Sequence, residues 1–207
     1  MSLKPSSMSF EQAAATPQAG LLALQALCDK GQIHSGQSVL INGAGGGVGS
    51  FAIQLAKSFG AEVTGVDSTS KLDSMRLLGA DQVIDYTRED FTRNGLHYDL
   101  IVDAAAYHSI TDYKRALSFT GTFVMVGGSS ALANRMLLLG PWFSIFGSKK
   151  ISLLMHQANK GLDSMIELFE AGKYVPVIDR RYPLADVADA LRYFGEGQTK
   201  GKIVITF

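Results

Sequence analysis

The fold of this chain is decided by the stretch Val39-Leu40-Ile41-Asn42-Gly43-Ala44-Gly45-Gly46-Gly47-Val48-Gly49. Its apolar, β-branched start predicts a short buried strand, and its glycines predict a turn that opens a helix. Such a turn leaves backbone N–H groups free at the N-terminus of the helix and removes side chains that would keep a phosphate away. The stretch therefore predicts a site for the pyrophosphate of a dinucleotide.

A run of glycines by itself is weak evidence, because many such runs are flexible loops. Here, apolar residues recur at helical spacing from Phe51 to Phe59, and a second predicted strand ends at Asp67. That acid lies 18 residues beyond Gly49, close to the spacing of about 20 that a ribose-binding carboxylate shows. The glycines are best described as Gly43-x-x-Gly46-x-x-Gly49. We expect valine at Gly46 or Gly49 to block the phosphate while the fold persists.

Helical and strand patterns alternate along most of the chain. A capping box at Ser9-x-x-Gln12 predicts a helix from Phe10 that Pro17 interrupts. Further helices are predicted at 18–28, 46–59, 70–78, 109–119 and 161–171, with strands at 38–42, 62–67, 82–85, 98–103, 122–126 and 149–155. The predicted fold is α/β, a Rossmann doubly wound six-stranded parallel sheet with helices on both faces. A C-terminal return segment follows, with strand 174–178, helix 184–194 and strand 202–206.

Ligands of parallel sheets bind at the carboxyl ends of the strands, so residues that follow predicted strands can line one crevice. Lys71 and Tyr86 are among these residues, but each also has an explanation without a ligand. Lys71 could be a solvated lysine, and Tyr86 could be packed at a strand end. The four histidines are expected to be structural, with His108 the least secure because it follows a strand on this side. The candidate cofactor-binding residues are Asn42, Gly43, Gly46, Gly47, Val48, Gly49, Asp67, Ser68, Lys71, Tyr86, Ala104, Val126 and Gly127.

Composition narrows the classes of function. The 207 residues carry 19 basic and 19 acidic side chains, which argues against a general attraction to nucleic acid or to an anionic membrane. No apolar run has the length of a transmembrane helix, and the first residues lack the apolar core of a signal peptide. Cys28 is the only cysteine, so no internal disulfide can form. We expect Cys28 to be a core residue and the protein to be cytoplasmic.

Several segments together resemble the cofactor-binding half of the medium-chain dehydrogenase/reductase superfamily. The branch that they resemble holds the zinc-independent quinone oxidoreductase-like, enoyl reductase-like and alcohol dehydrogenase-like enzymes. Two positions depart from its pattern, since Gly43 replaces an alanine and Leu22 a frequent Thr or Ser. The resemblance covers the chain from Phe10 onward. The matching segments are Glu11 to Pro17, Ala19 to Leu27, Val39 to Lys57, Leu78 to Asp81, Val83 to Tyr86 and Gly201 to Val204.

This resemblance implies an NAD(P)H-dependent oxidoreductase that transfers hydride to quinones, enones or related carbonyl substrates and needs no zinc. It implies that residues 10–175 form the NAD(P)-binding Rossmann domain and that 176–207 rejoin an N-terminal GroES-like catalytic domain. Residues 1–9 are expected to be a tail, which cloning could have supplied. We expect a fragment that is inactive alone, with its catalytic and substrate-selecting residues elsewhere. The alternative is a non-catalytic nucleotide-sensing or scaffold module with the same fold.

The choice of coenzyme is contested within the sequence. Asp67 should hydrogen-bond a ribose 2′-hydroxyl and repel a 2′-phosphate, which favours NAD(H). Ser68 and Lys71 supply a hydroxyl and a cation that suit a phosphate. By resemblance, Lys71 and Tyr86 match the lysine and tyrosine that hold this phosphate in members that use NADP(H). A third, basic contact is not matched, because Gly197 falls near its position. On balance we favour NADP(H) over NAD(H).

The resemblance also bears on assembly. Members of the family commonly dimerise by pairing the last strand of the cofactor sheet across a two-fold axis, and the matching strand is 149–155. We therefore expect an isologous homodimer through that strand. The apolar stretch 136–146 could be core, a covered interface or the wall of a pocket.

Overall fold

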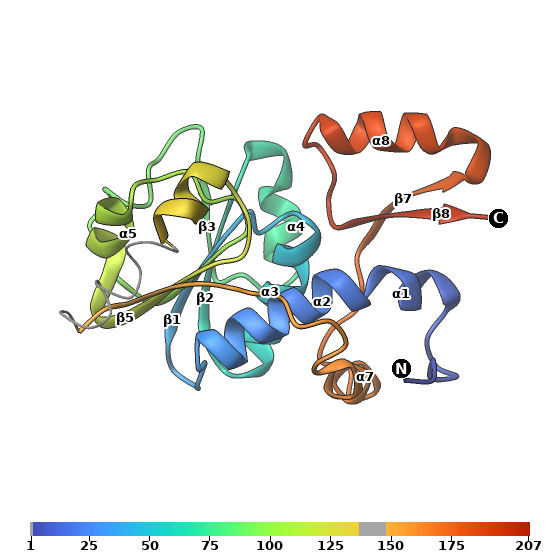
Figure 1. The fold of residues 1–207 in the computed structure, drawn as a ribbon, viewed down its shortest axis with the longest axis horizontal. Helices are drawn as coiled ribbons and strands as arrows, with labels where there is room; N and C mark the ends of the chain where they lie inside the picture. The colour runs from blue at the N-terminus through green and yellow to red at the C-terminus, as the bar shows by residue number, and fades with distance from the viewer. Residues whose placement is uncertain (1, 137–147) are drawn as a thin grey trace.

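The computed structural model describes residues 2–136 and 148–207 of the chain. Its centre is a six-stranded sheet with the strand order β3-β2-β1-β4-β5-β6 (Figure 1), in which every neighbouring pair is parallel. The order changes direction between β1 and β4, which creates a crevice at the carboxyl ends of those two strands. The predicted Rossmann sheet is thereby confirmed. The strands are β1 (Ser38–Asn42), β2 (Glu62–Asp67), β3 (Gln82–Asp85), β4 (Tyr98–Asp103), β5 (Leu117–Met125) and β6 (Lys150–Leu153).

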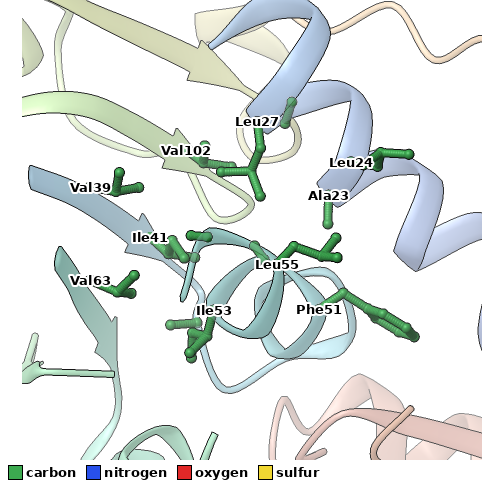
Figure 2. Packing of buried hydrophobic residues seen from close by; sticks show 14 of the residues in the cluster. Ala23, Leu24, Leu27, Val39, Ile41, Phe51, Ile53, Leu55, Val63 and Val102 are labelled. Atoms are coloured by element: carbon green, nitrogen blue, oxygen red, sulfur yellow. The ribbon is translucent and has the colours of Figure 1, made fainter. Parts of the chain in front are cut away.

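Helices cover both faces of this sheet, because the strands are apolar on both faces. Along β1, Val39 and Ile41 point to the face that carries α3, whereas Leu40 points to the face that carries α5. Figure 2 shows the hydrophobic cluster on the α3 face, in which Leu55 of α3 lies among residues of β1, β2 and α2. The helices are α1 (Phe10–Ala15), α2 (Pro17–Leu24), α3 (Gly47–Ser58), α4 (Leu72–Leu77), α5 (Ile110–Ala116), α7 (Leu162–Glu170) and α8 (Val187–Gly195).

The start of the chain follows its local signals. The Gln12 backbone N–H donates to Ser9 Oγ at 3.1 Å, and the Ser9 N–H donates to Gln12 Oε1 at 2.8 Å, which completes the predicted capping box. Pro17 occupies the first turn of α2, where its missing N–H costs no hydrogen bond. The helix predicted over 18–28 changes at Gln25 into a π-helical segment, Gln25–Lys30, that no sequence signal indicated.

The helix predicted over 109–119 is too long. Helix α5 ends at Ala116, and residues 117–119 begin strand β5. Leu117 pairs with Tyr98 of β4, and its side chain is fully buried in the core on one face of the sheet. Burial of this side chain together with strand pairing therefore outweighs the helical pattern.

The strand predicted over 174–178 is displaced in the structure, where β7 spans Ile178–Pro183. Tyr174 instead lies in the core, where its ring contacts Phe51 of α3 at 5.3 Å between centroids. Its hydroxyl donates to the Met165 carbonyl at 3.1 Å. Strand β7 pairs in parallel with β8 (Lys202–Thr206) in a second, two-stranded sheet. Strand β7 therefore begins only at Ile178, because tertiary contacts hold Tyr174 in the core.

This small sheet lies beside α1, and α8 packs over it (Figure 1). An ion pair between Arg181 of β7 and Glu11 of α1 joins it to the start of the chain at 2.8 Å. A second link is a hydrogen bond at 3.1 Å from the Gly201 N–H, just before β8, to the Gly45 carbonyl. The C-terminal segment therefore reaches the glycine turn. The apolar stretch predicted over 136–146 lies, except for Met136, outside the described residues.

Truncation of one core side chain should measure how much of the stability rests on α3. Leu55 is fully buried between α3 and the sheet (Figure 2). Leu55→Ala should lower the free energy of unfolding by about 2–5 kcal/mol, because it removes apolar contacts and leaves a cavity. Urea denaturation followed by circular dichroism measures this. Leu77→Ala is the matched control, since Leu77 is 87% exposed, and an equal loss in both variants would contradict the packing.

Candidate cofactor-binding site

The glycine turn leaves the N-terminus of α3 open to a ligand. Gly43 has φ +74°, a conformation that glycine adopts without strain, and its N–H donates to the Val66 carbonyl at 3.0 Å. Gly46 is the N-cap of α3, and no side chain caps that helix. The N–H groups of the first helical turn have no partners within a helix. They are therefore available to an anion, as the sequence predicted.

A cavity of about 770 Å³ lies at this turn, over the carboxyl ends of β1, β2, β3 and β4. Residues from four separate loops meet around it, because parallel strands end at the same edge of the sheet. The predicted residues that line it are Asn42, Gly43, Gly46, Gly47, Val48, Asp67, Lys71, Tyr86 and Ala104.

Four predicted residues do not line the cavity. Val126 and Gly127 follow β5, and both of their N–H groups donate to the Asp103 carbonyl. The Ser68 N–H donates to Asp67 Oδ1 at 2.8 Å. Gly49 faces the turn itself, since a Cβ there would lie 2.3 Å from the Gly43 oxygen. The structure therefore corrects the expectation that valine at Gly49 would leave the fold intact.

Asp67 and Lys71 form an ion pair with each other at the wall of the cavity. Asp67 Oδ2 accepts a hydrogen bond from the Gly45 N–H at 2.9 Å, and its Oδ1 lies 3.5 Å from the Lys71 ammonium. Both side chains are only 9% exposed. Lys71 also covers Gly45, where an added Cβ would lie 2.7 Å from the lysine side chain. The two charges therefore compensate each other while Asp67 fixes the turn.

A buried carboxyl lies beneath the cavity. Asp103, at the end of β4, is fully buried and accepts hydrogen bonds from Asn42 Nδ2 at 2.9 Å, the Ala105 N–H at 2.9 Å and Tyr113 Oη at 2.7 Å. Burial raises the pKa of Asp103 to about 6, although these three donors favour its charged form. The network joins β1, β4 and α5, and it holds the loop of Ala104 and Ala105 at the edge of the cavity.

Two residues at this site were missed in the sequence. Tyr107 lines the cavity beside Ala104 and Ala105, and it could have been found by extending the predicted strand-end loop, 104–106, by one residue. Lys202 is half-buried beside the turn, where a Cβ on Gly47 would lie 3.8 Å from its ammonium. Burial lowers the pKa of Lys202. The segment Gly201 to Val204, which contains Lys202, could be recognised in the sequence, but only the tertiary fold brings Lys202 to the glycine turn.

Across residues 2–136 and 148–207, no group of three or more His, Cys, Asp or Glu side chains could share a metal ion. No helix within those ranges has both the length and the apolarity to cross a bilayer. Burial lowers the pKa of His108, and Asp90 at 3.6 Å partly opposes this effect.

Comparison with known proteins places the chain in a family. A profile of the family described as zinc-binding dehydrogenase matches residues 78–205, which is more than half of the chain. The chain belongs to that zinc-binding dehydrogenase family. The cofactor-binding half of the medium-chain dehydrogenase/reductase superfamily, predicted from sequence, is thereby confirmed, and with it an oxidoreductase parentage.

Three known proteins show how similar the chain is to characterised oxidoreductases. It is 36% identical to 2-methylene-furan-3-one reductase of Solanum lycopersicum, over 99% of the chain and 49% of that protein. It is 34% identical to the chloroplastic NADPH-dependent alkenal/one oxidoreductase of Arabidopsis thaliana, over 99% and 49%. The solved quinone oxidoreductase of Coxiella burnetii superposes with a TM-score of 0.85 at 30% identity, over 100% and 63%. The chain thus spans about half the length of these two curated relatives.

Two glycine variants should separate ligand exclusion from loss of fold. A side chain at Gly46 meets only the Gly43 oxygen, at 3.3 Å, and otherwise enters the cavity. Gly46→Val should therefore weaken nucleotide binding at least tenfold, with a stability change within about 1 kcal/mol. Gly49→Val should lower the free energy of unfolding by about 3 kcal/mol or more, because its Cβ collides with backbone. Calorimetric titration and urea denaturation test both, and a folded, stable Gly49→Val variant would contradict the geometry.

The pH dependence of stability should report the buried carboxyl. Because the folded-state pKa of Asp103 is raised to about 6 from 3.8, the native state binds more protons between those values. Its contribution to stability should therefore fall as the pH rises from about 4 to 6 and then level off, by about 3 kcal/mol in all. Asp103→Asn should lack this component. Urea denaturation of both proteins from pH 4 to 7 gives the difference, and a flat difference would refute the assignment.

Proposed function

We propose that this chain binds NADP(H) in the cavity at the glycine turn and presents it for hydride transfer to quinones, enones or related carbonyl compounds in the whole enzyme. The observation that carries the proposal is the meeting of the glycine turn, the Asp67–Lys71 pair and Tyr86 around one cavity. Relatives named as enone, alkenal and quinone reductases support the reaction class.

In this proposal, different residues bind different parts of the cofactor. The N-terminus of α3, with Gly46 and Gly47, would hold the pyrophosphate through backbone N–H groups. The ammonium of Lys202 beside Gly47 would add a charge-assisted hydrogen bond to the same group. The bound nicotinamide would supply the hydride. The residues of this chain would orient the cofactor and keep its phosphates away from bulk water.

The preference for NADP(H) rests on the end of the cavity at β2 and β3. Lys71 and Tyr86 line that end with a cation and a hydroxyl group that suit a 2′-phosphate. Asp67 would repel that phosphate if its charge were uncompensated. Its hydrogen bond from the Gly45 N–H and its ion pair with Lys71 reduce this repulsion. An NADPH-dependent relative supports the same choice.

We also propose that catalysis proceeds without zinc and that the whole enzyme is an isologous dimer. The first proposal rests on the resemblance of the chain's motifs to the zinc-independent branch of the superfamily. Strand β6 supports the second, because it ends the strand order and pairs only with β5 in the described sheet. Its outer backbone edge can therefore extend the sheet into a second copy.

Binding of the two coenzymes tests the proposal directly. The unaltered chain should bind NADPH more tightly than NADH in calorimetric titration, and failure to bind either at millimolar concentration would refute the proposed function. Lys71→Met should weaken NADPH binding roughly 10- to 100-fold and change NADH binding little, since it removes a charge-assisted contact and unpairs Asp67. Lys57→Met is the control, because Lys57 pairs with Asp81 instead. Equal losses for both coenzymes would contradict the assigned role of Lys71.

A further inference from the structure

Tyr107 is an aromatic residue at the cavity for which the proposed function gives no role. It follows β4 and lines the cavity, and it is 57% exposed. Tyrosines 98, 113 and 174, by contrast, are buried in the core. An exposed ring at the edge of a ligand cavity can offer a flat apolar surface to a planar group.

The ring of Tyr107 is supported from behind. It lies against the His108 ring, with centroids 4.1 Å apart and planes 33° apart. The His108 ring in turn meets Phe91 edge-on at 5.1 Å and Tyr113 edge-on at 5.9 Å, and both of these are buried. The backbone N–H groups of Tyr107 and His108 both donate to Tyr113 Oη, at 3.2 and 3.3 Å. Tyr107 is therefore fixed in place although it is exposed.

Tyr107 lies beyond the carboxyl end of β4, at the edge of the sheet where the glycine turn and Asp67 also lie. Burial raises the pKa of Tyr107, and the charges of Asp90, Asp103 and Tyr86 raise this pKa further. Tyr86, Asp67 and Lys71 line the same cavity. In a dinucleotide whose pyrophosphate lies at Gly46 and whose adenosine ribose lies at Asp67, the base would occupy the remaining space of this cavity, which Tyr107 lines.

We propose that Tyr107 is the stacking platform for the adenine base and that His108 is the positioning residue that holds it. The inference rests on the proposed binding of NADP(H) and adds the residue that selects a planar base. Stacking of a base on an aromatic ring strengthens binding substantially and needs no hydrogen bond to the base. Phenylalanine should therefore serve at position 107, whereas alanine should not.

The experiment uses the 207-residue chain with NADPH and with 2′,5′-ADP, which keeps the adenine and the 2′-phosphate but lacks the nicotinamide. In calorimetric titration, Tyr107→Ala should weaken both ligands roughly 10- to 100-fold, whereas Tyr107→Phe should stay within about threefold. His108→Ala should weaken 2′,5′-ADP binding by a smaller factor, and His108→Phe should restore it. Phe119→Ala is the matched control, because Phe119 is 81% exposed on β5.

The outcomes separate the two proposals. Thermal unfolding of each variant within a few degrees of the unaltered chain shows that affinity, rather than folding, has changed. Unchanged affinity of Tyr107→Ala for 2′,5′-ADP would overturn the platform and leave NADP(H) binding standing. A failure of Tyr107→Phe to bind would likewise overturn it, because the ring would then not suffice. Absence of any binding by the unaltered chain would overturn the proposed function and the platform with it.

Discussion

The close approach of α3 to its own glycine turn is the constraint on which the site depends. The Gly43 carbonyl occupies the space that a Cβ on Gly49 would need. Only glycine at that position lets the helix begin so near the end of β1, and this contact directs the first N–H groups of the helix into the cavity. Asp67 then holds the turn from the side through the Gly45 N–H. Neighbouring strands supply the remaining walls because they all end at this edge.

Local signals were sufficient for most of the fold. The alternation of strands and helices, the capping box at Ser9 and the glycine spacing are each encoded within a few neighbouring residues, and the structure reproduces them. The errors arose where a distant contact decides. Tyr174 leaves its predicted strand because Phe51 offers it a place in the core. Leu117 leaves its predicted helix because Tyr98 pairs with it.

The sequence predicted the backbone positions of the candidate site, as it did for most of the fold, but not the charged partners within the site. Strand ends identify the residues at its edge, since parallel topology fixes where they meet. The pattern could not show that Asp67 and Lys71 neutralise each other, because their ion pair depends on how a loop folds back over Gly45. It also could not place Lys202, which lies more than 150 residues from Gly47 in the sequence. Electrostatic partners are thus harder to predict than backbone positions.

The link between the turn and the C-terminal segment has a consequence for biosynthesis. The Gly45 carbonyl accepts its hydrogen bond from the Gly201 N–H, and the next residue brings its ammonium to Gly47. A nascent chain can form the sheet and the turn long before those residues emerge from the ribosome, since domains fold during synthesis. The phosphate-binding end of the cavity gains its last donor only after residue 202 has emerged. In the proposed binding mode, tight binding of the nucleotide would therefore follow the formation of the sheet during synthesis.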